Sequence, residues 1–302
     1  MAGNIGVFRR FPYGYNRAPW NNLLNKLKPA IKTYLSEVFL VSQRNLENLS
    51  SKKLKILFSK REEWEPLIRK DFRYTHHELV FGGFNDDLEQ YDLLVPLTIV
   101  DLEYLNSNGH LIKKNPIPIP SQECLDLCND KYLFYEKLVE NGFGKYTPRI
   151  SSNLPYPYIL KKRIDEWGIN SHIITDREHE LLFSDCLTSP EYFCQELVPG
   201  KDEYTTHILF SKGKVVCASN IKYVFNTDFF IKGRDESPVQ CHKIEQSPYL
   251  FLFSSILQTI GFEGLCCFNY KIVNDKPIIF EINPRFGASL SNHFLDFVRC
   301  LT

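Results

Sequence analysis

Apolar and polar positions alternate in short blocks along most of the chain, which is typical of a protein that mixes strands with helices. In the first third, residues 54–58 and 93–97 are apolar and favour strands, and Pro96 ends the second run. The charged stretch between them, residues 60–73, is compatible with a helix. Because strands alternate with helical segments, we predict a small α/β domain over residues 1–120.

A proline-rich connector at residues 112–120 separates this part from the rest, because alternating prolines favour extended backbone. We expect the aromatic and arginine-rich opening, residues 8–21, to be a packed N-terminal arm, with a recognition loop as the alternative. After the connector we predict one helix that ends at Gly142 and Gly144, since four apolar residues share a face at helical spacing. Those residues are Leu127, Phe134, Leu138 and Val139.

From about residue 155 the pattern becomes that of β-structure. Strands are predicted where apolar runs end at turn residues, and hairpins where two runs flank a short polar loop. The predicted elements are strands at 156–160 and 192–198, hairpins of 205–210 with 214–218 and of 265–273 with 277–282, and a helix at 248–260.

Composition and charge exclude several classes of protein. Lys and Arg total 36 and Asp and Glu total 36, and this zero net charge argues against a general nucleic-acid binder. Aromatic residues make up 14% of the chain, which argues against intrinsic disorder. No apolar run approaches the roughly 20 residues that span a bilayer, and the sequence does not open with a signal-peptide pattern. The nine cysteines lack metal-like spacing, so we expect reduced thiols and a cytoplasmic location.

The final predicted hairpin carries polar side chains in strands that are otherwise apolar. The exceptions are Asn269 and Lys271 in the first strand and Glu281 and Asn283 in the second. Glu281 and Asn283 share one face, because side chains alternate along a strand. Burying a carboxylate costs several kcal/mol without compensation, and a hard cation is one natural compensation.

The register of this hairpin brings a third oxygen-bearing side chain to the same place. If the loop has three residues, Val273 faces Pro277 and Asn269 lies opposite Glu281. Mg²⁺ takes oxygen ligands and is usually shared with substrate phosphates. Arg285 follows closely and suits a phosphate or a carboxylate.

The segment FEINPRFGAS, residues 280–289, resembles the metal-binding strand of the ATP-grasp superfamily. The resemblance implies that Glu281 and Asn283 bind the Mg²⁺ or Mn²⁺ that bridges the phosphates of ATP. It also implies that Arg285 contacts phosphate or an acyl-phosphate intermediate. Many members carry a carboxylate near Asn269, so we expect Asn269 to make the metal site weaker, with a hydrogen-bonded core amide as the alternative.

Two further segments resemble the phosphate-binding parts of the same superfamily. CNDKYLFYEKLVENGFGKYTP, residues 128–148, is similar to a helix with a phosphate-facing lysine, which would be Lys131. YPYILKKRIDEWGINS, residues 156–171, is similar to a strand with a nucleotide-binding lysine and the loop over the phosphates. Lys161 is the matching lysine, and Ser171 would donate a hydrogen bond or cap a turn.

A fourth segment, YFCQELVPGKDEYTTHIL, resembles the hinge between the two subdomains. In the superfamily, backbone groups of the hinge hold the adenine, which places it at Glu196, Leu197 and Val198. A carboxylate a few residues later holds the ribose hydroxyls, and the matching residue is Glu203.

The resemblance covers roughly residues 121–294 and implies an α/β (α+β) ATP-grasp fold. Two α+β subdomains would grip ATP, residues 121–197 with the lid loop and residues 198–302 with the metal site. The N-terminal α/β domain, residues 1–120, would precede them as a pre-ATP-grasp-like unit.

The activity that the resemblance implies is ATP-dependent ligation. A substrate carboxylate would be activated as an acyl phosphate and joined to an amine-type nucleophile, with release of ADP and phosphate. Arg285 and Lys161 would act on the reacting groups. The expected partners are ATP and small carboxylate and amine substrates, with no nucleic acid or membrane, and a homodimer is left open.

Two other interpretations are retained. One is a catalytically weak nucleotide-binding or regulatory module on the same fold, favoured by Asn269 and by a lid loop, residues 165–171, that keeps a single glycine. The other is an unrelated α/β protein in which Glu281 forms an ordinary ion pair with a lysine or with Arg285.

Other charged residues have weaker patterns. Lys222 and Arg234 lie between the β-segments and are expected at the surface, with a contact to the γ-phosphate or acceptor as the alternative. His207, His242 and His293 have no partner spacing, so we expect core or surface roles for them.

Overall fold

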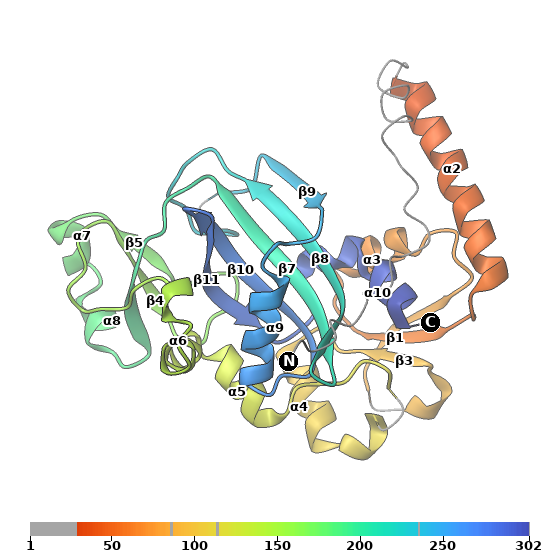
Figure 1. The fold of residues 1–302 in the computed structure, drawn as a ribbon, viewed down its shortest axis with the longest axis horizontal. Helices are drawn as coiled ribbons and strands as arrows, with labels where there is room; N and C mark the ends of the chain where they lie inside the picture. The colour runs from red at the N-terminus through yellow and green to blue at the C-terminus, as the bar shows by residue number, and fades with distance from the viewer. Residues whose placement is uncertain (1–28, 85–86, 113–114, 235, 302) are drawn as a thin grey trace, which may run out of the picture. The chain divides into compact units, whose positions relative to one another are not determined.

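The computed structural model describes residues 29–84, 87–112, 115–234 and 236–301 of the chain (Figure 1). The chain divides into two compact units, Met1–Ser51 and Lys52–Thr302. In the first unit, α2 (Pro29–Ser50) is one helix of 22 residues. The predicted arm at residues 8–21 lies outside the described residues. The predicted domain boundary near residue 120 stays a prediction.

The second unit begins with a small parallel sheet. β1 (Lys55–Ser59) lies between β2 (Glu78–Gly82) and β3 (Leu93–Val95) and runs parallel to both. Parallel neighbours need a crossover connection, and α3 (Glu65–Asp71) lies in the connection from β1 to β2. After β3 the chain continues into α4 (Ile99–Ser107). The strands predicted at 54–58 and 93–97 are therefore confirmed.

The helix predicted at residues 60–73 is shorter than expected. α3 begins only at Glu65, and Pro66 stands in its first turn. A proline has no N–H and its ring clashes with the carbonyl four residues earlier, so a helix is well tolerated after Pro66 and poorly before it. Pro66 in the sequence is therefore a signal for the later start of this helix.

The single helix predicted after the connector is also wrong, because the structure has two. α5 (Gln122–Asn129) and α6 (Lys131–Glu140) are separated by Asp130, whose backbone is extended at φ −86° and ψ 104°. The Asp130 carboxylate accepts hydrogen bonds from the N–H groups of Tyr132 (3.0 Å) and Leu133 (3.1 Å). It is therefore the N-cap of α6. Of the predicted apolar face, Phe134 and Leu138 are buried, Leu127 is half-buried and Val139 is exposed.

A three-stranded antiparallel sheet follows. β4 (Tyr158–Lys162) lies between β5 (His172–Ile174) and β6 (Tyr192–Glu196). Two short helices connect β5 to β6, α7 (Arg177–Leu181) and α8 (Ser184–Thr188). The strands predicted at 156–160 and 192–198 are confirmed with shifted ends.

The largest element is a five-stranded antiparallel sheet with the order β11-β10-β7-β8-β9. One of its faces packs against α9, α5 and α6, where Phe253, Phe268 and Ile208 belong to one buried cluster (Figure 1). Both predicted hairpins and the helix predicted at 248–260 are confirmed. The bounds are β7 (Asp202–Ser211), β8 (Lys214–Val224), β9 (Gln240–Ile244), α9 (Leu250–Thr259), β10 (Gly264–Val273) and β11 (Lys276–Asn283).

The chain then returns to the first sheet. In α10 (Phe294–Leu301), Phe294 packs against Phe58 of β1 with ring centroids 5.6 Å apart. Phe286 and Leu265 belong to the same buried cluster, so one core joins the small parallel sheet to the five-stranded sheet. The 3₁₀ helices are η1 (Leu88–Gln90), η2 (Gly109–Ile112), η3 (Gly144–Tyr146) and η4 (Ala288–Asn292).

The turn of the last hairpin differs from the prediction. Val273 pairs with Lys276, so the loop has two residues, and the predicted pair of Val273 with Pro277 is wrong. Asn274 and Asp275 adopt positive φ values of 49° and 59°. Such two-residue turns match the right-handed twist of the strands, and Asn and Asp tolerate positive φ better than most residues.

We predict that replacing Asp130 with alanine destabilises the second unit by about 2 kcal/mol. The change removes the N-cap of α6 and the ion pair between Asp130 and Arg163, whose Nη2 and Oδ2 atoms are 2.7 Å apart. Urea unfolding measures the loss. Asp126→Ala, the same change at an exposed position of α5, is the control, and equal stability of the two variants would contradict the prediction.

Candidate nucleotide and metal site

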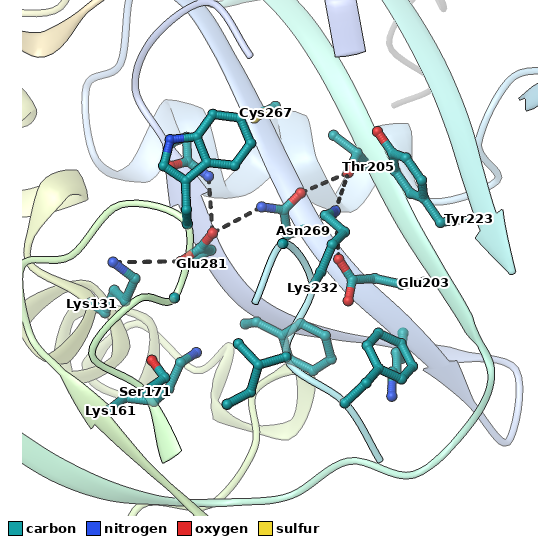
Figure 2. A pocket seen from close by; sticks show the side chains of 18 of the residues that line it. Lys131, Lys161, Ser171, Glu203, Thr205, Tyr223, Lys232, Cys267, Asn269 and Glu281 are labelled. Carbon is teal, nitrogen blue, oxygen red and sulfur yellow. Dashed lines mark hydrogen bonds and ion pairs between the residues drawn. The ribbon is translucent and has the colours of Figure 1, made fainter. Parts of the chain in front are cut away.

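One cavity of the second unit takes residues from both antiparallel sheets, and Figure 2 shows it from close by. Every residue that the sequence singled out for a site lines this cavity. Their common location does not test the roles assigned to them, which stay predictions. These residues are Lys131, Lys161, Ser171, Glu196, Leu197, Val198, Glu203, Asn269, Glu281, Asn283 and Arg285.

The floor of the cavity is the face of the five-stranded sheet that the helices leave uncovered. Alternate residues of a strand point to the same face, and the cavity-lining residues of β7 and β10 are spaced by two. The residues between them, such as Thr206 of β7 and Phe268 of β10, are fully buried. The lining residues are Glu203, Thr205 and His207 from β7 and Cys267, Asn269 and Lys271 from β10.

A β-bulge in β11 changes which of its residues face the cavity. Tyr270 pairs with Ile279, whereas the next pair is Asn269 with Glu281, so Phe280 is an extra residue. The consecutive residues Phe280 and Glu281 therefore both line the cavity. The predicted pairing of Asn269 with Glu281 is confirmed, because the turn is one residue shorter than expected and the bulge adds one residue back.

Hydrogen bonds and positive charge surround the Glu281 carboxylate. Its Oε1 accepts from Nδ2 of Asn269 (2.9 Å) and from Nδ2 of Asn283 (3.1 Å). Its Oε2 lies 3.6 Å from Nζ of Lys131. Burial alone would raise the pKa of Glu281, but Lys131, Lys161 and the two amides outweigh it and lower the pKa to about 2. The group is therefore a carboxylate at any physiological pH.

Two lysines face this carboxylate, of which Lys161 is buried and Lys131 is half-buried. Lys161 is 8% exposed and donates a hydrogen bond to Oε1 of Gln195 at 3.2 Å. Burial lowers the pKa of Lys161 to about 8 and the charge of Lys131 acts in the same direction, while Glu281 opposes both. Nζ of Lys131 also donates to the carbonyl of Asp165 (2.6 Å), which ties α6 to the lid loop.

The lid loop, residues 165–171, packs tightly over one side of the cavity. Trp167 and Gly168 have φ values of 62° and 65°. A Cβ atom at Gly168 would lie 2.7 Å from Cγ2 of Ile231, so a larger residue would force a neighbour to move, and the positive φ also favours glycine. Ser171 is buried at the end of the loop. The single glycine of the lid therefore allows close contact with the segment that follows β8.

A chain of polar contacts crosses the floor of the cavity from Glu203 to Glu281 (Figure 2). Glu203 forms an ion pair with Lys232 (2.6 Å), and Lys232 donates to Oγ1 of Thr205 (3.3 Å). Thr205 donates to Oδ1 of Asn269 (2.7 Å), and Nδ2 of Asn269 in turn donates to Oε1 of Glu281. Burial alone would lower the pKa of Lys232, but the carboxylate of Glu203 outweighs burial and raises the pKa of Lys232. The ribose-site and metal-site carboxylates of the prediction are thus connected.

The far end of the cavity holds Arg285 and a neutral histidine. Nη2 of Arg285 lies 3.8 Å from Oε1 of Glu166 in the lid loop. Nε2 of His207 is 2.8 Å from Oγ of Ser289, and burial lowers the pKa of His207 to about 3. A Cβ at Gly287 would lie 2.6 Å from Cε1 of His207, so this turn admits only glycine without movement. His207 therefore lines the site, which the sequence did not predict.

Two cavity lysines were not assigned a role from the sequence. Lys271 was noted as a polar exception in a buried strand, and its alternation with Asn269 was the signal that could have placed it at the site. Lys232 lies in an irregular segment with no pattern that points to it. Lys222 and Arg234, which were considered instead, are not among the described residues that line the cavity.

The oxygen donors beside Lys131 suit a divalent cation that is bound together with a negatively charged group such as a phosphate. Glu281 is the only carboxylate of the predicted metal ligands, and Asn269 and Asn283 supply amide oxygens after a half-turn of each amide. Across the described residues there is no group of three or more His, Cys, Asp or Glu side chains that could hold a metal. Mg²⁺ often binds through one or two carboxylates and is completed by phosphate oxygens and water, so the donor set fits an ion shared with a polyphosphate.

The family of the chain follows from its sequence as well as from this geometry. Residues 128–289 match the family described as ATP-grasp domain. This match spans more than half of the 302 residues, and the chain belongs to the ATP-grasp domain family. The family and fold expected from the four segments are therefore confirmed. No curated protein matches the sequence.

Solved structures with the same fold include three from different proteins. D-alanine–D-alanine ligase from Bacillus anthracis is 13% identical, with 82% of this chain and 93% of that chain covered and a TM-score of 0.52. L-amino acid ligase from Bacillus licheniformis is 14% identical, with 81% and 70% covered and a TM-score of 0.52. N5-carboxyaminoimidazole synthase from Aspergillus clavatus, in complex with ADP and 5-aminoimidazole ribonucleotide, is 11% identical, with 81% and 73% covered and a TM-score of 0.52. Identities this low show the fold alone.

The structure also bears on the membrane expectation. In the described ranges, no helix has both the length and the apolar character needed to cross a bilayer.

Proposed function

We propose that the protein is an ATP-dependent ligase that activates a substrate carboxylate as an acyl phosphate and transfers the acyl group to an amine-type nucleophile. The observation that carries the proposal is the Glu281 carboxylate, held ionised between two amides and two lysines in one cavity. A single half-buried carboxylate beside cations and amides suits a divalent ion that phosphate oxygens also bind.

In this proposal, the nucleoside of ATP binds at the hinge end of the cavity. Glu196, Leu197 and Val198 would supply backbone edges, and the apolar side chains of Ile159 and Phe280, which line the same cavity, would contact the base. Glu203 would hold the ribose hydroxyls. Its carboxylate already binds Lys232, and the two oxygens of a carboxylate accept more than one donor, so the two roles are compatible.

The triphosphate of ATP would bind at the other end of the cavity, beside the lid loop. Lys131 and Lys161 supply fixed positive charge, and Glu281, Asn283 and Asn269 would hold the cation. Bound Mg²⁺ would neutralise charge on the phosphates and orient the terminal one. The lid loop is tied to Lys131 by a hydrogen bond and so lies beside the proposed triphosphate. There the loop would also exclude water from a hydrolysable intermediate.

The proposed reaction depends on the positioning of its substrates and does not need a nucleophilic side chain of the protein. A substrate carboxylate oxygen would attack the γ-phosphorus and displace ADP, giving an acyl phosphate. An amine nitrogen would attack the acyl carbon, lose a proton and expel phosphate, giving an amide. Arg285 would stabilise negative charge on the transferring group, and the acceptor pocket is placed beside it near Ser289.

A second candidate is a nucleotide-binding or regulatory module on the same fold with little turnover. The observation that favours it is Asn269, which leaves the metal site with a single carboxylate, while its Oδ1 accepts from Thr205. Turnover is what separates the two candidates, since both predict binding of ATP with Mg²⁺.

The ligase proposal predicts ADP formation when the protein meets ATP, Mg²⁺ and pools of carboxylic acids and amines. Glu281→Gln should lower the rate by a factor of at least about 100, because a charge that holds the cation is lost. Glu140→Gln, an exposed position on α6, should leave the rate unchanged. Binding of ATP without ADP formation in any pool would favour the regulatory module, and full turnover by Glu281→Gln would refute the metal assignment.

The substitution Asn269→Asp should lower the thermal stability of the metal-free protein and strengthen its binding of Mg²⁺. Without cation, the introduced carboxylate would face Glu281 directly and the 2.9 Å hydrogen bond would be lost, so the melting temperature should fall. With Mg²⁺ and a nucleotide, the added charge should lower the Mg²⁺ concentration for half-maximal binding by a factor of about 10. Calorimetry and thermal unfolding measure both, and an unchanged Mg²⁺ requirement would remove Asn269 from the site.

The affinity for ATP should decrease above pH 8. Lys161 has a pKa of about 8 in the free protein, and a bound triphosphate stabilises its ammonium form and raises that pKa. Binding then takes up a proton at high pH, so affinity is greatest below pH 8 and falls by up to about tenfold per pH unit above it. Calorimetry between pH 7 and pH 9.5 tests this. Lys161→Arg, which keeps its charge, should show a flatter profile, and identical profiles would contradict the prediction.

A further inference from the structure

We infer that Lys271 is a positioning residue for the nucleobase, because its buried side chain joins the hinge to the segment 225–233 that covers the cavity. The inference rests on the proposed binding of ATP and goes beyond it by assigning the nucleoside end of the cavity a residue of its own. Lys271 is 3% exposed and lies on β10, two residues from Asn269 on the same face.

The contacts of Lys271 reach two separate parts of the chain. Its Nζ donates to the carbonyl of Val198 at 3.0 Å, and Val198 lies in the hinge. It also donates to the carbonyl of Asp228 at 3.2 Å, in the segment that covers the cavity. The same ammonium lies 4.1 Å from the centroid of the Phe230 ring, which adds a cation–π contact.

The two parts are also joined by backbone bonds around the same point. The carbonyl of Asp228 accepts from the N–H of Gly200 at 3.1 Å, so one carbonyl serves both the backbone after the hinge and Lys271. The N–H of Phe225 donates to the carbonyl of Lys201 at 2.9 Å. The segment 225–233 then brings Ile231 and Lys232 to the cavity. Lys271 is thus placed at the junction that sets the distance between hinge and cover.

A buried cation at this position has a cost that an apolar residue would not have. Burial lowers the pKa of Lys271 to about 8, although the carboxylates of Glu203 and Asp228 oppose the shift. The compensation consists of the two carbonyls and the aromatic ring. With an apolar side chain at this position, the carbonyls of Val198 and Asp228 would lose a charged donor. This loss would weaken the contact between the hinge and the segment 225–233 more than it would disturb the five-stranded sheet.

The location separates Lys271 from the lysines placed on the phosphates. Lys131 and Lys161 face Glu281, whereas the acidic groups that face Lys271 are Glu203 and Asp228. The carbonyl of Val198 is engaged by Lys271 and the N–H of Glu196 donates to the carbonyl of Arg149 at 2.8 Å. The hinge is therefore held from both sides, and Lys271 should affect binding of the nucleoside without affecting binding of a triphosphate group.

The test compares two probes as their Mg²⁺ complexes, a non-hydrolysable ATP analogue and methyl triphosphate, which lacks base and ribose. We expect Lys271→Met to weaken the ATP analogue by a factor of about 10 to 100 and methyl triphosphate by less than about twofold in calorimetry. Lys131→Met is the matched control and should weaken both probes. Equal weakening of both probes by Lys271→Met, or no weakening of either, would overturn the inference.

A second variant keeps the inference testable even if Lys271→Met does not fold. Lys271→Gln keeps one donor group but loses the charge, so the bonds to the carbonyls of Val198 and Asp228 should weaken. We expect this variant to lower severalfold the ratio of the affinity for the ATP analogue to the affinity for methyl triphosphate. A ratio equal to that of the unmodified protein would overturn the inference. Failure of the unmodified protein to bind the ATP analogue would overturn the proposed function itself, and this outcome is distinct from the other two.

Discussion

The carboxylate of Glu281 is the point on which the rest of the site depends. It lies 3.6 Å from the ammonium of Lys131 and accepts hydrogen bonds from Asn269 and Asn283, which keeps it ionised although it is half-buried. Each of these partners belongs to a different piece of the fold, namely α6, β10 and the end of β11. A helix, two strands and the lid loop bound to Lys131 are therefore held in one arrangement by one negative charge, and a small change there would be felt across the cavity.

A backbone irregularity makes that arrangement available. In a regular β11, Glu281 would share a face with the buried Ile279, because residues two apart point the same way. The extra residue Phe280 reverses the alternation, so that Ile279 stays in the core while Glu281 enters the cavity. The cost of the interrupted ladder is local, whereas burying Glu281 in the apolar core would have cost several kcal/mol. The bulge thus reconciles a packed core with a charged floor on the two sides of one strand.

What could be predicted from the sequence depended on local patterns. The hairpins, the order of the four segments and the residues that line the cavity were accessible, because alternation and motif spacing act over a few residues. The two-residue turn at Asn274 and the bulge at Phe280 were not, and their effects cancelled, so the pairing of Asn269 with Glu281 was predicted correctly for an incomplete reason. Lys232 was missed because its place depends on how the segment after β8 folds back over the sheet, which no local pattern records.

A neutral protein can hold a strongly cationic cavity, and this explains why overall charge was a poor guide to the site. The zero net charge argues against a general nucleic-acid binder but says nothing about how charges are paired inside the protein. Lys232 is neutralised by Glu203, whereas the hydrogen bonds that Lys161 and Lys271 donate within the described residues go to amide or carbonyl oxygens. Buried ammonium groups with neutral partners are poorly compensated, which is why their pKa values are lowered. An anionic ligand beside Lys161 would supply the missing charge there, so the same imbalance that weakens the free protein would favour binding of a triphosphate.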